Sequence, residues 1–229
     1  MNVLITGASR GIGFQTALRL SENPLLQIYA LARNSQKLRE LAQRAVHKNI
    51  HILEFDLAAD DCSKISQWLD GLTINVLINN AAVLINKSFF DTSIEEWHRV
   101  FEINLFSIVK IINLLKDKFD KTKKSHILNI GSMGGFQGST KFAGLSAYSV
   151  SKGALSVLTE CLSVELLSEN IAVNCLALGA VQTEMLSVAF PNYKPPISDE
   201  EIAKFIANFA LEGMNYFNGK IIPVSFTNP

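Results

Sequence analysis

The stretch Thr6-Gly7-Ala8-Ser9-Arg10-Gly11-Ile12-Gly13 decides the fold, because it joins a short apolar strand to a helical pattern without a linker. Glycines let the backbone turn tightly and approach a pyrophosphate, and the following helix offers unpaired N–H groups to an anion. The spacing is Gly-x3-Gly-x-Gly rather than Gly-x-Gly-x-x-Gly, and a lone glycine triplet also occurs in simple turns. Its position between the first strand and the first helix favours a phosphate-binding loop.

Short β-branched runs alternate with longer helical patterns along the rest of the chain. Strands are predicted near residues 2–6, 27–32, 50–55, 75–79, 125–131, 171–177 and 220–224, and helices near 12–21, 35–47, 61–70, 94–118, 147–168 and 199–210. Apolar runs such as Val76-Leu77-Ile78 suit parallel strands that are covered on both faces. Repeated strand-helix-strand units predict an α/β fold, a three-layer doubly wound parallel sheet of about seven strands (the Rossmann fold), with its ligand at the carboxyl ends of the strands.

Composition predicts one globular domain over residues 1–229, because the chain is 48% apolar and shows no linker, repeat or low-complexity segment. Lysine plus arginine balance aspartate plus glutamate at 21 each, which predicts no nucleic-acid or acidic-membrane partner. The one basic run, Lys116 to Lys124, follows a helical pattern and is interpreted as a solvated helix end.

The cysteines and histidines indicate the redox state of the cell compartment and whether a metal site is expected. Three widely spaced cysteines fit a reducing cytoplasm, and four scattered histidines lack metal-ligand spacing, so no metal is predicted. The N-terminus reads as a strand rather than a secretory signal, and no apolar run approaches the roughly 20 residues of a membrane span.

Tyr148 and Lys152 are four residues apart on a predicted helix, so their side chains share one face. A unit-charge pair near 4 Å is worth about 4 kcal/mol at an effective dielectric of about 20, which predicts a lowered pKa for the Tyr148 phenol. The alternative is an ordinary amphipathic helix with a buried tyrosine and a solvated lysine. The spacing alone does not decide between them.

Five separated motifs resemble the short-chain dehydrogenase/reductase family in order and spacing, over nearly the whole chain. They are the glycine loop, Asn79-Asn80-Ala81-Ala82 after the fourth strand, Asn104 inside a long helix, Ser132 after the fifth strand, and Tyr148-x3-Lys152. The resemblance implies an NAD(P)-dependent oxidoreductase with Asn104, Ser132, Tyr148 and Lys152 at its catalytic site.

The resemblance also implies a role for each of these four residues. Tyr148 would exchange the proton and Ser132 would hydrogen-bond the carbonyl oxygen. Lys152 would hold the nicotinamide ribose and favour the tyrosinate. Asn104 would hold a water that links Lys152 to solvent, although a polar interruption on an exposed helix face is the alternative.

The cofactor contacts implied by the resemblance come from six segments. They are Thr6, Gly7, Ser9, Arg10, Gly11, Ile12, Gly13, Arg33, Asp56, Leu57, Asn80, Ala81, Tyr148, Lys152, Gly179, Val181 and Thr183. Arg33 ends the second strand, where a carboxylate would accept from a ribose hydroxyl and an arginine favours a 2′-phosphate. With Arg10 it predicts NADP(H) as the preferred cofactor and NAD(H) as a possible one, unless Arg33 only caps a loop. Asp56 would contact the adenine or cap the next helix.

Residues 184–198 resemble the family's variable substrate lid, which is short and moderately apolar here and predicts a small or medium carbonyl substrate. The chain departs from the family at Ala82 and Leu178, and residues 225–229 replace its usual Asp-Gly-Gly ending. A homodimer or homotetramer is expected, with helices 94–118 and 147–168 as its seam, although the ending makes a tetramer less assured.

Three functions are therefore open at this point. The leading one is NADPH-dependent reduction of a ketone or aldehyde, or the reverse alcohol oxidation. The alternatives are reduction of a 3-oxoacyl thioester and a non-catalytic NADP(H)-binding sensor or scaffold.

Overall fold

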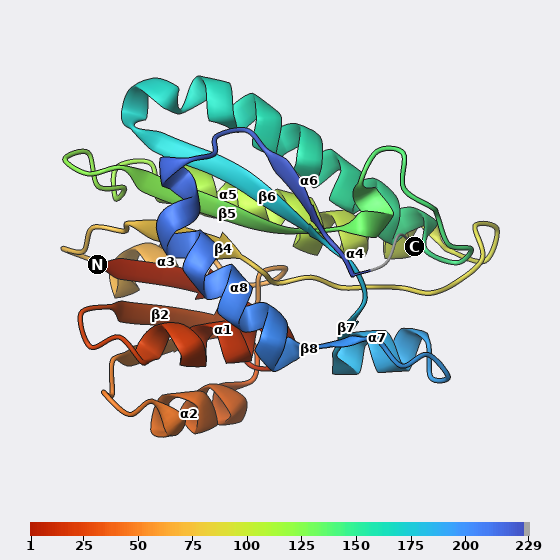
Figure 1. Ribbon diagram of the computed structural model, residues 1–229, viewed down its shortest axis with the longest axis horizontal. Coiled ribbons are helices and arrows are strands. Elements are labelled where there is room, and N and C mark those ends of the chain that lie inside the picture. The colour runs from red at the N-terminus through yellow and green to blue at the C-terminus, as the bar shows by residue number, and fades with distance from the viewer. Residues whose placement is uncertain (227–229) are drawn as a thin grey trace.

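The computed structural model describes residues 1–226 and contains a seven-stranded parallel sheet (Figure 1). Its strands are β1 (Asn2–Thr6), β2 (Gln27–Ala32), β3 (Ile50–Glu54), β4 (Val76–Asn79), β5 (Ser125–Ser132), β6 (Ile171–Leu178) and β9 (Ile221–Val224). The strand order is β3-β2-β1-β4-β5-β6-β9, which confirms the predicted doubly wound fold. The order reverses between β1 and β4, where ligands bind in such sheets. Residues 227–229 of the atypical ending lie outside the described residues.

Helices cover both faces of the sheet (Figure 1). One face carries α1 (Gly11–Ser21), α2 (Ser35–Arg44) and α8 (Asp199–Glu212). The other carries α3 (Ser63–Trp68), α4 (Ile94–Phe101), α5 (Ser107–Leu114) and α6 (Ser146–Glu165). Among residues 1–226, no helix combines the length and the apolar character needed to cross a membrane.

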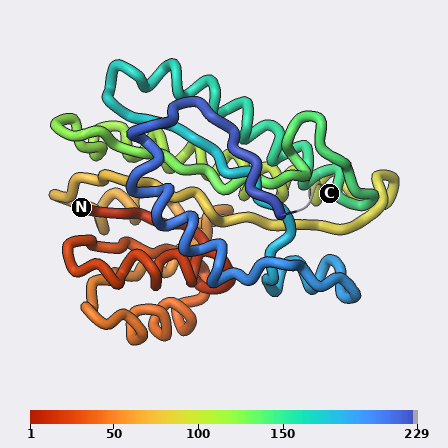
Figure 2. The backbone as a smooth tube through the Cα atoms, viewed as in Figure 1, coloured from red at the N-terminus to blue at the C-terminus, as the bar shows by residue number. Residues whose placement is uncertain are grey.

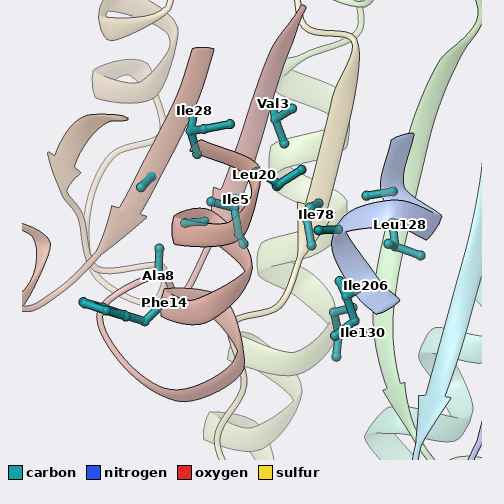
Figure 3. Close-up of a cluster of buried hydrophobic side chains, with 14 of the residues drawn as sticks. Val3, Ile5, Ala8, Phe14, Leu20, Ile28, Ile78, Leu128, Ile130 and Ile206 are labelled. Carbon is teal, nitrogen blue, oxygen red and sulfur yellow. The ribbon is translucent and has the colours of Figure 1, made fainter. Parts of the chain in front are cut away.

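The strands from β1 to β6 supply both cores, because successive side chains point to opposite faces of a sheet, whereas β9 packs into one core only. Val3 and Ile5 pack toward α1 and α8, together with Ile78 and Ile206, in the cluster drawn in Figure 3. Leu4, between them in sequence, packs into the opposite core beneath α5 and α6. This alternation explains why the central strands are apolar throughout.

The predicted helix 94–118 is not continuous. A π-helical turn, Glu102–Phe106, separates α4 from α5, and α5 ends at Leu114. Ser93 starts α4 with a capping box, in which its hydroxyl accepts from the Glu96 N–H while the Glu96 carboxylate accepts from the Ser93 N–H. The π-helical turn lies at Asn104, at the place where a mid-helix asparagine needed an explanation.

A small unit of α7 (Glu184–Ala189) and the paired two-residue strands β7 (Val181–Gln182) and β8 (Ile197–Ser198) stands outside the main sheet. It occupies the segment predicted as the lid. Figure 2 shows it on the same side of the molecule as the loops that follow β4 and β5. These segments all follow the carboxyl ends of strands.

A buried polar network fixes the C-terminal elements to the sheet. The fully buried His126 on β5 hydrogen-bonds the Ala210 carbonyl oxygen through Nδ1 at 2.9 Å and the Asn174 amide through Nε2 at 3.1 Å. Asn174 also donates to the Phe217 carbonyl and accepts from the Lys220 N–H. Burial lowers the pKa of His126 to about 4, so its imidazole is neutral at neutral pH.

His126 therefore makes stability depend on pH. Between an ordinary pKa of 6.5 and about 4, the unfolded chain binds a proton at this imidazole that the folded chain excludes. The free energy of unfolding should fall by up to about 3 kcal/mol as the pH drops through this range, with the full contribution present above pH 6.5. Urea titrations from pH 7 to 4.5 measure the slope. His126→Gln should flatten this slope, whereas the exposed control His98→Gln should retain it. Equal slopes for the His126→Gln variant and the unsubstituted chain would contradict the assignment.

Candidate active site

The glycine loop lies against the end of β4. Gly7 and Gly11 have φ angles of +70° and +53°, which L side chains rarely adopt. The Asn80 side-chain amide donates to the carbonyls of Thr6 and Gly7 at 3.0 and 3.1 Å, and the Thr6 hydroxyl accepts from the N–H groups of Asn80 and Ala81. Asn80 and Ala81 thus brace this loop.

Glycine is required at position 13 because a side chain would not fit there, and not because of the backbone angles. A Cβ at Gly13 would lie 2.3 Å from the Asn80 amide nitrogen and 2.4 Å from the Gly7 carbonyl oxygen. Because the loop coils tightly at the N-terminus of the 11-residue helix α1, N–H groups gather where an anion would bind. Ser9 is half-buried in this loop and Ile12 packs against the core. The residues present fit a dinucleotide pyrophosphate.

Tyr148 and Ser132 meet because α6 packs closely on the turn after β5. A Cβ at Gly135 in that turn would lie 2.5 Å from backbone atoms of Lys152 and Gly153, so only glycine permits the approach. The Ser132 hydroxyl hydrogen-bonds Tyr148, and it also accepts from the Gly134 N–H at 3.1 Å. This pair lies at the carboxyl edge of the sheet, at the same edge as the glycine loop.

Lys152 lies near the ring of Tyr148 and bonds the backbone of β5. Its buried ammonium donates to the Ile130 carbonyl oxygen at 2.7 Å and lies 5.9 Å from the centroid of the Tyr148 ring. Burial lowers the pKa of Lys152 to about 8. Burial also raises the pKa of Tyr148, against the smaller opposing effect of the Ser132 hydrogen bond. The predicted lowering of the Tyr148 pKa is therefore wrong for the chain alone, because desolvation outweighs the effect of the Ser132 hydrogen bond.

Asn104 is fully buried in the π-helical turn, so it is not a polar interruption on an exposed face. Its carbonyl oxygen accepts from the Val83 N–H at 2.8 Å, and its amide donates to the Val83 carbonyl and to the Ser151 hydroxyl, both at 3.0 Å. The side chain thus ties the segment after β4 to α6, beside Lys152. Its role in a water-mediated proton relay stays a prediction.

The structure brings together only some of the residues that were predicted to contact the adenosine end of the cofactor. Arg33 is exposed at the end of β2, whereas Arg10 forms an ion pair with Glu184 at 2.8 Å. Asp56 accepts from the Ala58 N–H at 3.0 Å in a local turn and does not cap the next helix, α3, which begins at Ser63, and Leu57 packs against the core. Among the ion pairs of residues 1–226, Arg33 takes part in none.

The segment after β6 runs from the sheet to α7. Gly179 donates its N–H to the Val224 carbonyl at 2.9 Å, and Val181 is buried in β7. Thr183 caps α7, accepting from the Leu186 N–H, and its methyl group faces Gly11. A Cβ at Gly11 would lie 3.5 Å from that methyl, so the start of α7 lies close to the glycine loop.

Sequence reasoning missed Asn86. Its side chain donates to the Ala189 carbonyl at 2.7 Å, at the far end of α7, and its loop is joined to the segment before Tyr148 by a Lys87 N–H to Gly144 carbonyl bond of 3.0 Å. No periodicity or motif marks a loop asparagine of this kind.

Comparisons with known proteins identify the family and the fold. A family model described as short chain dehydrogenase matches residues 1–194. The chain is 29% identical to a 3-oxoacyl-[acyl-carrier-protein] reductase of Chlamydia trachomatis over 96% of this chain and 94% of that protein.

Solved structures share the fold. The 3-ketoacyl-(acyl-carrier-protein) reductase of Brucella melitensis, complexed with NADH, superposes with a TM-score of 0.86 at 20% identity, over 97% of this chain and 96% of that one. A dehydrogenase structure from Beutenbergia cavernae, with bound NADP at low occupancy, gives a TM-score of 0.85 at 22% identity, over 98% and 94% of the two chains.

Proposed function

The chain belongs to the short-chain dehydrogenase family, as an NAD(P)-dependent oxidoreductase of carbonyl and hydroxyl groups, and from this premise we propose that it reduces a ketone or aldehyde with NADPH. The observation that carries the proposal is the meeting of Ser132, Tyr148 and Lys152 at the sheet edge that also holds the glycine loop. The same groups serve the reverse oxidation of an alcohol.

Each side chain has a role that its surroundings support. The nicotinamide, when bound, supplies the hydride for the carbonyl carbon. Tyr148 donates the proton to the carbonyl oxygen, which suits a phenol whose raised pKa keeps it protonated at neutral pH. Ser132 donates a hydrogen bond to the same oxygen and orients it.

Lys152 also has a role toward the cofactor, in addition to its place next to the Tyr148 phenol. With a pKa of about 8, its ammonium is mostly protonated at neutral pH. Within residues 1–226 it donates to the Ile130 carbonyl alone, which leaves two of its three N–H groups for the hydroxyls of the nicotinamide ribose. Asn104 holds α6 in place through Ser151, and the relay water remains part of the proposal.

Cofactor preference is proposed from charge. Arg10 and Arg33 lie in the glycine loop and at the end of β2, and both are exposed. In a doubly wound fold, the second position is next to the adenosine ribose, where guanidinium groups favour a 2′-phosphate. NADP(H) is therefore the proposed cofactor, with NAD(H) accepted more weakly.

A 3-oxoacyl thioester is the second candidate substrate, because the Chlamydia trachomatis relative is a 3-oxoacyl-[acyl-carrier-protein] reductase. Exposed apolar side chains stand on the three segments that follow β4, β5 and β6, where an acyl chain would run. They are Phe89, Phe90, Phe142, Val188 and Tyr193. The sensor alternative is less favoured because Tyr148 and Lys152 are both retained.

We also propose a homodimer or homotetramer in the cytoplasm. Three free cysteines fit a reducing compartment. Apolar side chains are exposed on the outer surfaces of α4, the π-helical turn and α6, as an oligomer seam requires; they are Ile94, Phe106, Val150, Val157 and Val164. Sedimentation equilibrium should give two or four times the chain mass of 25.2 kDa, and a monomer at micromolar concentration would contradict the seam.

A substrate panel read by NADPH absorbance should show turnover of ketones, aldehydes or 3-oxoacyl thioesters.

On the best substrate, Tyr148→Phe should lower kcat by about 10²- to 10⁴-fold, because the proton donor is lost, while NADPH still binds. Tyr216→Phe, at an exposed tyrosine after α8, is the matched control and should retain activity. Near-normal turnover by Tyr148→Phe would refute the assignment, and NADPH binding without turnover of any compound would favour the sensor.

Fluorescence titrations at fixed salt should give tighter binding of NADPH than of NADH. Arg33→Gln should weaken NADPH binding and leave NADH binding unchanged, because only NADPH carries the 2′-phosphate. Arg39→Gln, at an exposed arginine on α2, controls for the loss of one positive charge. Equal affinities for NADPH and NADH would contradict the proposed preference.

A further inference from the structure

The lid helix α7 is fastened at both ends to the loops around the candidate site. At its start, Glu184 pairs with Arg10 of the glycine loop at 2.8 Å, and the Thr183 methyl group lies against Gly11. At its end, the Ala189 carbonyl accepts from Asn86 at 2.7 Å. The two attachments place the Glu184 carboxylate directly on the guanidinium that the proposed function assigns to the cofactor.

The Arg10–Glu184 pair is exposed, with 55% and 64% of the respective side chains accessible. Exposed ion pairs are worth little, because water screens the charges and two long side chains must be ordered. A ribose 2′-phosphate carries more charge than one carboxylate and accepts several hydrogen bonds from a guanidinium. Such a phosphate can therefore displace Glu184 from Arg10 at small cost.

We propose that Glu184 is a specificity-determining residue that competes with the cofactor 2′-phosphate for Arg10. This inference rests on the proposed NADP(H) function, which it deepens. When the ribose carries a free 2′-hydroxyl, Arg10 stays on Glu184 and the lid remains fastened to the glycine loop. When the ribose carries a phosphate, Arg10 moves to it, and binding is weakened by the broken pair and by the nearby carboxylate. Glu184 thus narrows the preference for NADPH over NADH.

The two cofactors and the Arg10→Gln variant together separate this role from a general charge effect. NADPH carries more negative charge than NADH, so a carboxylate that only repelled the nucleotide would weaken the binding of both, and its effect on NADPH would persist without Arg10. A carboxylate that acts through Arg10 weakens only the cofactor that needs Arg10. Position 184 also lies on an exposed surface, so its substitution leaves the core untouched.

The test is equilibrium titration of the full chain with NADPH and with NADH, followed by nucleotide fluorescence at low salt. Glu184→Gln should lower the Kd for NADPH by about two- to five-fold, the range expected for an exposed pair, and leave the Kd for NADH unchanged. In an Arg10→Gln background, Glu184→Gln should have no effect on NADPH binding. Glu165→Gln, an equal charge change at the exposed far end of α6, should change neither Kd.

Three results would overturn the inference. One is an unchanged or raised Kd for NADPH in Glu184→Gln. Another is a parallel fall of the Kd for NADH, and the third is the same gain without Arg10. If the unsubstituted chain bound neither nucleotide, the proposed function would fail and this inference with it. If it bound NADPH and Glu184→Gln changed nothing, only the role of Glu184 would fall.

Discussion

The close approach of the glycine loop to the end of β4 is the contact on which the candidate site depends. Asn80 fills the space that Gly13 leaves open, and its amide bonds two consecutive carbonyls of the loop. Because β1 and β4 are the strands between which the sheet order reverses, this contact lies where ligands bind in doubly wound sheets. A side chain at position 13 would push the loop away from the strand that positions it.

A second set of contacts fixes α6, which carries Tyr148 and Lys152. Asn79, Asn129 and Thr159 form a buried hydrogen-bonded row from β4 through β5 to α6, with distances of 2.8 and 2.9 Å. Positions 152 and 159 are two helical turns apart and share one face of α6. The hydrogen bond between Thr159 and the sheet therefore also fixes where Lys152 lies along the sheet. Buried polar groups of this kind stabilise only one placement of the helix on the sheet, because a shift of the helix would leave them without hydrogen-bond partners.

Periodicity and glycine placement predicted the fold class and the seven main strands. These features depend on local chain geometry and on burial, which a sequence displays directly. The π-helical turn at Asn104 was not predicted, because the same residues fit an unbroken α-helix and only contacts with Val83 and Ser151 explain the bulge. The Tyr148 pKa was mispredicted for a related reason: spacing places Lys152 nearby, but burial and the direction of its ammonium are tertiary properties. Asp56 shows the same limit, since an aspartate at a strand end fits a helix cap, a ligand contact and the local turn that it forms with Ala58.

The pairing of β6 with β9 has a consequence for how the protein is made. Gly179, where the chain leaves β6 for the lid, donates its N–H to Val224, and a Cβ at Gly179 would lie 2.5 Å from the Ser225 hydroxyl. Residues 221–225 follow every other described strand in the sequence, so this turn gains its partner only after the rest of the sheet has been synthesised. The glycine loop can assemble with β4 on the nascent chain, whereas the β6 side of the candidate site is completed only when β9 is present. The two sides of the candidate site therefore form at different times during translation.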